Sequence, residues 1–240
     1  MQTMILPKKV CNDIEGLIRR FIWGSASPTP KLSLINWEAI CQPMKSGGLG
    51  LRCMHNFNIA FILKLSYSIV TRTSSLWVTL LREKYGLQEI LPQSVRKGSC
   101  TSLWRAIANS WDLLRDNLAW SLGNGESVNF LQDVWIPVLG PLRNHLLYHV
   151  SLGSTFSFAE FITNDGNWDL AKLSMFFTQT VVQHIAGIKC PTFQDVSDSC
   201  FWKHDSKHVF SIQSAYACIS NQQWDAHQPI WKQIWHLLVP

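Results

Sequence analysis

The apolar residues of this chain follow a helical repeat in its first half and lose that repeat near residue 119. The strongest helical segment is 55–73, and the buried face predicted for it consists of Ile59, Ile62, Leu63, Ser66, Ile69 and Val70. After residue 119 the pattern shortens to strand-like segments around a Gly-Asn-Gly turn. A change of period within one chain indicates that helices and β-structure share the fold.

Other helices are predicted from the same spacing and from residues that favour helix ends. They are a helix between Pro7 and Gly24 and the segments 36–41, 76–85, 103–114, 168–188, 214–220 and 231–238. Two hairpins are expected, one pairing 119–122 with 127–131 and one pairing 200–204 with 208–212. The predicted fold class is therefore mainly α with two short β-hairpins (α+β), an irregular helical connector region.

The charges of the chain are distributed unevenly. Hydrophobic residues make up 47% and charged residues 15%, so the chain should bury a core rather than stay disordered. Residues 1–120 carry 15 Lys/Arg and 7 Asp/Glu, a net of +8, whereas residues 121–240 have a net of −3. A basic first half favours contact with a nucleic-acid backbone, and an ordinary solvated surface is the alternative.

The cysteine pattern favours an intracellular protein with free thiols. The seven cysteines are odd in number and include no C-x-x-C pair. The N-terminal residues lack the apolar stretch of a signal peptide, and no apolar run reaches the length of a membrane span.

No segment carries a convincing catalytic or cofactor-binding pattern, so no cofactor and no catalytic residue is predicted. The segment Gly47-Gly48-Leu49-Gly50 lacks the spacing of a phosphate-binding loop and predicts a tight turn. The chain contains no Asp-Asp pair of the kind that holds magnesium in polymerases. The spaced pairs Asp112/Asp116 and Asp165/Asp169 are typical of helix surfaces or caps.

The best metal-like set is Cys200, His204 and His208, with Cys190 upstream. Its spacing matches no standard zinc finger. If 200–204 is an extended strand, Cys200 lies roughly 13 Å from His204, at about 3.3 Å per residue. We therefore predict no structural zinc.

Several motifs spread over the chain resemble those of one family when they are taken together. They are Phe21-Ile22-Trp23-Gly24, the Gly47–Arg52 segment, Ser75-Leu76-Trp77 with Leu81-Arg82-Glu83-Lys84-Tyr85-Gly86, Gly123-Asn124-Gly125 with Phe130 to Trp135, Phe210-Ser211-Ile212-Gln213-Ser214-Ala215-Tyr216, and Trp231-Lys232-Gln233-Ile234-Trp235. This order resembles plant non-LTR retrotransposon (LINE-type) reverse transcriptases, in the region between the polymerase core and the C-terminal zinc-binding domain. Leu131 and Gln213 depart from the family pattern, which has Trp and Lys there.

The resemblance implies a division into three regions. Residues 1–92 would be a basic helical region that follows the polymerase core, 93–195 a connector, and 196–240 the truncated start of the zinc-binding domain of the reverse transcriptase. It also implies that the catalytic aspartates and the zinc ligands lie outside this chain. The chain is then a non-catalytic intracellular fragment, with the nucleus as a candidate compartment, whose partners are RNA or DNA and the remainder of the retrotransposon polyprotein.

Nine cations in the first half are the predicted phosphate contacts: Arg19, Arg20, Lys31, Lys45, Arg52, Arg82, Lys84, Arg96 and Lys97. Trp23 and Trp37 have ring faces that can stack on bases, although packing is the more common role for such residues. Two alternatives stay open, a purely structural connector and a non-functional remnant without activity.

Overall fold

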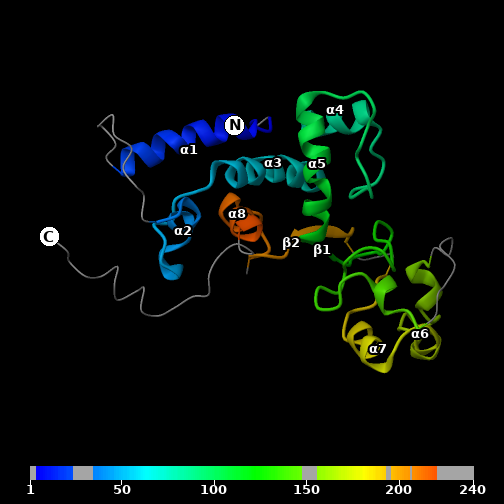
Figure 1. Ribbon diagram of the computed structural model, residues 1–240. Helices are drawn as coiled ribbons and strands as arrows, with labels where there is room; N and C mark the ends of the chain where they lie inside the picture. The colour runs from blue at the N-terminus through cyan, green and yellow to red at the C-terminus, as the bar shows by residue number, and fades with distance from the viewer. Residues whose placement is uncertain (1–3, 24–34, 148–155, 193–195, 206, 221–240) are drawn as a thin grey trace. The chain divides into compact units, whose positions relative to one another are not determined.

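The computed structural model describes residues 4–23, 35–147, 156–192, 196–205 and 207–220 (Figure 1). In these residues the chain is mainly helical, and one antiparallel pair of strands forms a sheet, which confirms the predicted fold class. The elements are α1 (Lys8–Ile22), α2 (Trp37–Cys41), η1 (Met44–Ser46), α3 (Met54–Thr71), α4 (Leu76–Tyr85), α5 (Ser102–Asp116), β1 (Leu118–Ser121), η2 (Leu142–His145), η3 (Phe158–Phe161), α6 (Leu170–Phe176), α7 (Gln179–Ala186), β2 (Ser199–Trp202) and α8 (Ile212–Ser220).

The chain divides into two compact units that interleave in the sequence. Unit 1 comprises Met1–Ser66, Gly98–Ser110 and Ser211–Pro240, and unit 2 comprises Tyr67–Lys97 and Trp111–Phe210. The three regions predicted at 1–92, 93–195 and 196–240 follow family similarity rather than compactness, so that division stays a prediction.

Unit 1 is built around α3, which contacts both α1 and α8 (Figure 1). Glu15 of α1 is 8% exposed, and its carboxylate accepts hydrogen bonds from the indole Nε1 of Trp37 at 2.9 Å and from the backbone N of Met54 at 2.8 Å. Since Met54 is the first residue of α3, an anion at this position also stabilises the helix dipole. One carboxylate thus connects α1, α2 and α3.

The helix predicted between Pro7 and Gly24 is confirmed as α1, but only part of its apolar stripe lies on the side that packs. Cys11 and Glu15 are its buried residues and Ile18 packs against the core, whereas Leu17 is 59% exposed and Phe21 is 88% exposed. The spacing of apolar residues therefore gives the helix correctly and only part of the face that packs.

Unit 2 contains the sheet, and its strands come from distant parts of the sequence. β1 pairs antiparallel with β2, with Leu118 opposite Trp202 and Ser121 opposite Ser199. The two local hairpins predicted around residues 119–131 and 200–212 are therefore wrong in their pairing. Each predicted first strand exists, but each pairs with the other rather than with its sequence neighbour.

The Gly-Asn-Gly loop after β1 is held by a carboxylate instead of closing a hairpin. Asp198 is 5% exposed, and its two oxygens accept from the backbone N of Gly123 at 2.7 Å, Gly125 at 3.0 Å and Ser127 at 2.9 Å. A Cβ on Gly123 would lie 1.8 Å from the backbone O of Val196, so glycine is required there. The loop consequently turns toward the segment that leads into β2.

An aromatic cluster forms the core of the remainder of unit 2. Its rings are in mutual contact at centroid distances from 4.6 to 6.3 Å and comprise Phe130, Trp135, Phe158, Phe161, Trp168 and Phe177. The single helix predicted over 168–188 is wrong, because it divides into α6 and α7 at Phe177, whose backbone is extended (φ −129°, ψ 154°). This break places Phe177 in the cluster, where it is 2% exposed.

A buried ion pair connects the C-terminal part of α5 to the loop that follows β1. Arg115 donates to Asp133 at 3.3 Å and to the carbonyl oxygens of Leu91 and Pro92 at 2.7 and 2.9 Å. Burial raises the pKa of Asp133, and Arg115 opposes that shift. The guanidinium, the carboxylate and the two carbonyl groups thus all find hydrogen-bond partners within one cluster.

In the part of the chain that the structure describes, we find no helix with the length and apolar character that crossing a bilayer requires.

Candidate nucleic-acid interface

The nine predicted phosphate contacts divide between the two units. Arg19, Arg20, Lys45 and Arg52 belong to unit 1, as does Lys31, which lies outside the described residues. Lys45 is in η1, where only its backbone is described. Arg82, Lys84, Arg96 and Lys97 belong to unit 2. The structure therefore does not gather the nine residues on one compact body.

The net charge is concentrated on unit 1 when it is counted by unit. Unit 1 holds 10 Lys/Arg and 4 Asp/Glu in the sequence, a net of +6, whereas unit 2 holds 11 and 12, a net of −1. One of the acidic residues of unit 1, Glu15, is buried and engaged by two donors. The cations on the surface of unit 1 are thus opposed by few exposed carboxylates.

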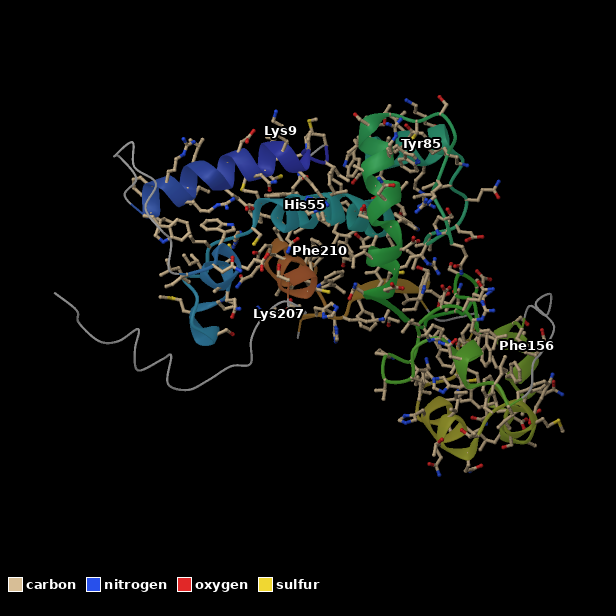
Figure 2. The ribbon with its side chains drawn as sticks, in the orientation of Figure 1. Lys9, His55, Tyr85, Phe156, Lys207 and Phe210 are labelled. Atoms are coloured by element: carbon tan, nitrogen blue, oxygen red, sulfur yellow. The ribbon has the colours of Figure 1, made fainter. Side chains whose placement is uncertain are left out.

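Helix α1 carries the clearest group of exposed cations. Lys8, Lys9 and Arg20 are exposed, and Figure 2 shows Lys9 on the side of α1 away from His55 of α3. Because 11 residues complete just over three turns, Lys9 and Arg20 share one face and lie about 16 Å apart along the axis. A spacing of this size spans several phosphates of a duplex.

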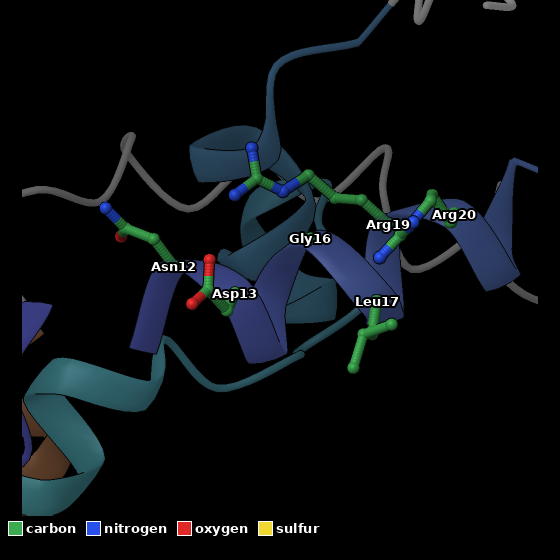
Figure 3. Close-up of a pocket in the computed structure, with 6 residues that line it drawn as sticks. All are labelled: Asn12, Asp13, Gly16, Leu17, Arg19 and Arg20. Atoms are coloured by element: carbon green, nitrogen blue, oxygen red, sulfur yellow. The ribbon is translucent and has the colours of Figure 1, made fainter. Parts of the chain in front are cut away.

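A shallow groove of about 580 Å³ lies against the same helix, and Figure 3 shows that all six of its described lining residues come from α1. They are Asn12, Asp13, Gly16, Leu17, Arg19 and Arg20. Gly16 has no atom within 4 Å of the position that a Cβ would occupy, so the backbone is open to close approach there. The groove therefore combines two guanidinium groups, an amide, the carboxylate of Asp13 and an accessible stretch of backbone.

Two of the predicted contacts in unit 1 are also engaged in packing. The guanidinium of Arg19 lies 5.4 Å from the ring centroid of Trp37, and its Nε donates to the backbone O of Glu15 at 3.3 Å. The guanidinium of Arg52 lies 4.7 Å from the Phe57 ring, yet its side chain remains exposed. Such cation–π contacts hold the guanidinium in place without neutralising its charge.

The two tryptophans considered for base stacking are used in the core of unit 1. Trp37 is 9% exposed, and its ring packs edge to face against Trp23 at a centroid distance of 6.2 Å. Ile18 and Leu51 pack against the same small core. Packing is therefore the role that the structure gives to Trp37, and Trp23 is half-buried against it.

The four predicted contacts of unit 2 have different surroundings. Arg82 donates to the backbone oxygens of Ile69, Gln88 and Glu89, and burial lowers its pKa. Lys84 lies 5.6 Å from the Tyr85 ring centroid, while Arg96 and Lys97 are exposed in the segment before α5. Arg82 thus fixes the end of α4 rather than facing a ligand.

Lys8 and Lys9 were not among the nine predicted contacts, although the sequence contained a signal for them. Each lies 11 residues before one arginine of the Arg19-Arg20 pair, and a helix over this segment was predicted. Projecting the segment onto a helical wheel would have placed the four cations together. The isolated position of Lys8-Lys9 near the start of the chain concealed that relation.

The metal-like residues do not form a ligand cluster in the described part of the chain. Among those residues, no three His, Cys, Asp or Glu side chains are grouped so that they could hold an ion. His204 contacts the side-chain oxygen of Asn117, and the ring of His208 packs edge to face against Phe201. Burial raises the pKa of the Cys200 thiol.

Comparison with known proteins finds two plant relatives. The chain is 29% identical over 223 residues to a "putative ribonuclease H protein" of Arabidopsis thaliana, which covers 92% of this chain and 36% of that protein. It is 28% identical over 143 residues to an "uncharacterized mitochondrial protein" of the same plant, which covers 59% of this chain and 93% of that protein. The chain thus spans about a third of the first relative.

No family model and no solved structure matches the chain. The relatives are consistent with a plant retrotransposon-related protein and do not single out a reverse transcriptase.

Proposed function

We propose that this chain is a non-catalytic segment of a plant retrotransposon reverse-transcriptase polyprotein, and that unit 1 binds the phosphate backbone of RNA or DNA without reading its sequence. The observation that carries the proposal is the concentration of charge, +6 on unit 1 against −1 on unit 2. The exposed cations Lys8, Lys9 and Arg20 on a single helix supply the contacts.

Backbone binding follows from the kind of groups that are present. Lysine and arginine side chains release condensed counterions when they neutralise phosphates, so affinity falls steeply with salt and depends little on sequence. The aromatic rings that would have read or stacked bases, those of Trp23 and Trp37, are engaged with each other. We therefore expect dissociation constants of about 10⁻⁴ to 10⁻⁶ M at physiological salt.

The first relative's name raises hydrolysis of RNA as a second activity to consider. That chemistry needs clustered carboxylates around metal ions. In the described residues, the buried carboxylates Asp133, Asp198 and Glu15 each serve a separate structural set of donors. Because the match covers 36% of that relative, we propose that this chain contributes binding and that catalysis resides elsewhere.

The experiment measures fluorescence anisotropy of a labelled 20-mer RNA–DNA hybrid with the full chain. The variant Lys8→Gln/Lys9→Gln/Arg20→Gln removes three exposed charges from unit 1. Its matched control, Arg72→Gln/Arg143→Gln/Lys207→Gln, removes three exposed charges from unit 2. We expect the first variant to lose at least ten-fold in affinity and to reduce the salt slope by about 2 to 3, since each lost phosphate contact removes about one.

Equal losses in both variants would contradict the proposal, because net charge alone would then set affinity. No binding by the wild-type chain at 50 mM salt would favour the alternative of a purely structural connector or a remnant without activity. In a structural connector, cations would serve to hold the fold together, as Arg82 does through its hydrogen bonds to three backbone carbonyl oxygens. We further propose that the protein acts inside the cell, the nucleus included, together with the remainder of its polyprotein and without a bound zinc ion.

A further inference from the structure

Two cysteines of unit 1 are brought together by a backbone turn that closes independently of them. α2 ends at Cys41, and the chain returns through η1 and the glycine-rich turn that follows it. The backbone N of Leu49 donates to the O of Ile40 at 2.9 Å, and the N of Gly50 donates to the O of Gln42 at 2.8 Å. The segment that follows this turn then places Cys53 against the core that contains Cys41.

A close approach of a second backbone segment makes this turn rigid. A Cβ on Gly48 would lie 2.0 Å from the backbone O of Gln42, so the two segments touch at a glycine. Gly47 and Gly50 have φ angles of +90° and +71°, which glycine adopts without strain. The positions of the two cysteines are thus fixed by the turn rather than by a bond between them.

The two thiols differ in surroundings. The Cys41 thiol is buried and donates a hydrogen bond to the sulfur of Cys53, which is half-buried. The hydroxyl of Tyr216 also hydrogen-bonds the Cys53 side chain, and it accepts from the Cys53 backbone N at 3.0 Å. These donors lower the pKa of Cys53, while the hydrogen bond and burial raise the pKa of Cys41.

We propose that Cys41 and Cys53 are a redox-active pair that a hydroperoxide converts to a disulfide. The Cys53 thiolate attacks the terminal oxygen of the hydroperoxide, the O–O bond breaks, and Cys53 becomes a sulfenic acid with release of hydroxide from hydrogen peroxide or of an alkoxide from an organic hydroperoxide. The Cys41 sulfur then attacks the Cys53 sulfur, and the S–O bond breaks. The thiol proton of Cys41 leaves with that oxygen as water, so the pair has lost two electrons to the peroxide.

Four other thiols of the described chain are less suited to the first step. Burial raises the pKa of each of the thiols of Cys11, Cys190, Cys200 and Cys218, which keeps them protonated and weakly nucleophilic. The disulfide would close the loop 41–53, which contains Lys45 and Arg52. It would therefore connect α2 covalently to the residue that precedes α3.

The sequence supplies a direct assay in the full chain, because trypsin cleaves after Lys31, Lys45, Arg52 and Lys64. Reduced protein yields Cys41 in peptide 32–45 and Cys53 in peptide 53–64 as separate species. After treatment with one to five equivalents of hydrogen peroxide and alkylation of free thiols, we expect these peptides to be joined, with a mass lower than their sum by two hydrogen atoms. Dithiothreitol should separate them again.

Two variants distinguish the proposed pair from general oxidation. Cys41→Ser should leave Cys53 as a sulfenic acid that dimedone labels at least ten-fold faster than Cys200. Cys53→Ser should give neither the joined peptides nor dimedone labelling of Cys41. Circular dichroism establishes that both variants are folded.

The proposal is overturned if folded wild-type protein forms no 41–53 link, or if its cysteines oxidise at equal rates. It is also overturned if the joined peptides appear only in urea. Because the assay reads peptide masses, its outcome is independent of nucleic-acid binding.

Discussion

Unit 1 and unit 2 both bury carboxylates, but they differ in the charge that remains on their surfaces. In unit 2, which is near neutral, Asp133 pairs with Arg115 inside the fold, and Asp198 binds three backbone N–H groups. In unit 1, Glu15 is likewise buried, and the cations Lys8, Lys9 and Arg20 point to solvent. Carboxylates therefore hold the structure together in both units, whereas the surplus of cations, a net of +6, belongs to unit 1.

The difference shows that a cation's surroundings decide its role more than its place in a basic stretch. Arg20 and Arg82 both lie in the last turn of a helix. Arg20 is exposed, whereas Arg82 is half-buried and donates to three backbone oxygens. A cation whose donors are occupied by the protein has few left for a phosphate. Changes at buried carboxylates should accordingly alter stability, and changes on α1 should alter binding.

The largest effect is expected at Asp198 of unit 2. Asp198→Ala leaves the N–H groups of Gly123, Gly125 and Ser127 without their charged acceptor in a half-buried loop, so the free energy of unfolding should fall by about 3 to 5 kcal/mol. Urea denaturation followed by tryptophan fluorescence measures it. Asp112→Ala, on the exposed face of α5, is the control and should stay within about 0.5 kcal/mol of wild type. A loss below 1 kcal/mol for Asp198→Ala would show that water replaces the carboxylate without cost.

A smaller effect is expected at Glu15, the buried carboxylate of unit 1. Glu15→Gln retains one acceptor oxygen but turns an amide N–H₂ toward one of its two donors, the Trp37 indole or the Met54 backbone N. The free energy of unfolding should fall by about 1 to 3 kcal/mol, the cost of one unsatisfied buried donor. Glu38→Gln, exposed on α2, is the matched control. An unchanged stability in Glu15→Gln would mean that apolar packing alone holds α1 to α3.

The smallest effect is expected at Gly16, in the middle of α1. Gly16→Ala meets no atom within 4 Å and removes backbone freedom from the unfolded chain, so it should raise the free energy of unfolding by about 0.5 to 1 kcal/mol. Gly50→Ala, at φ +71°, should instead lower that free energy by about 1 kcal/mol. Destabilisation by Gly16→Ala would indicate that another segment occupies the groove on α1.

The sequence predicts helices in this protein better than it predicts contacts between them. The limits of α4 agree with the prediction because Gly86 ends the helix in the left-handed conformation, a local signal. The face of α3 that includes Ile62, Leu63 and Ile69 is buried as expected, because apolar spacing determines it directly. Both signals act within a few residues of the chain.

Signals of this local kind do not predict which distant segments pair with each other. The Gly-Asn-Gly segment by itself favours a hairpin turn. It forms a loop bound to the Asp198 carboxylate instead, and Asp198 lies 75 residues farther along the chain from Gly123. Glu15 was equally hidden, since its donors Trp37 and Met54 lie on other elements. For the candidate interface, the basic character could be predicted from the sequence, but the division of the cations between units could not, because the units interleave in the chain.

The most direct test of the account asks which lysines a bound nucleic acid covers. Acetic anhydride labels exposed lysines of the full chain with and without the 20-mer hybrid, and mass spectrometry measures the labelling rate at each site. We predict at least five-fold protection of Lys8 and Lys9 in unit 1 and unchanged rates at Lys84, Lys97 and Lys207 in unit 2, all of which are exposed in the free chain. Protection of Lys84 and Lys97 with Lys8 and Lys9 unprotected would place the contacts on unit 2 and contradict the account.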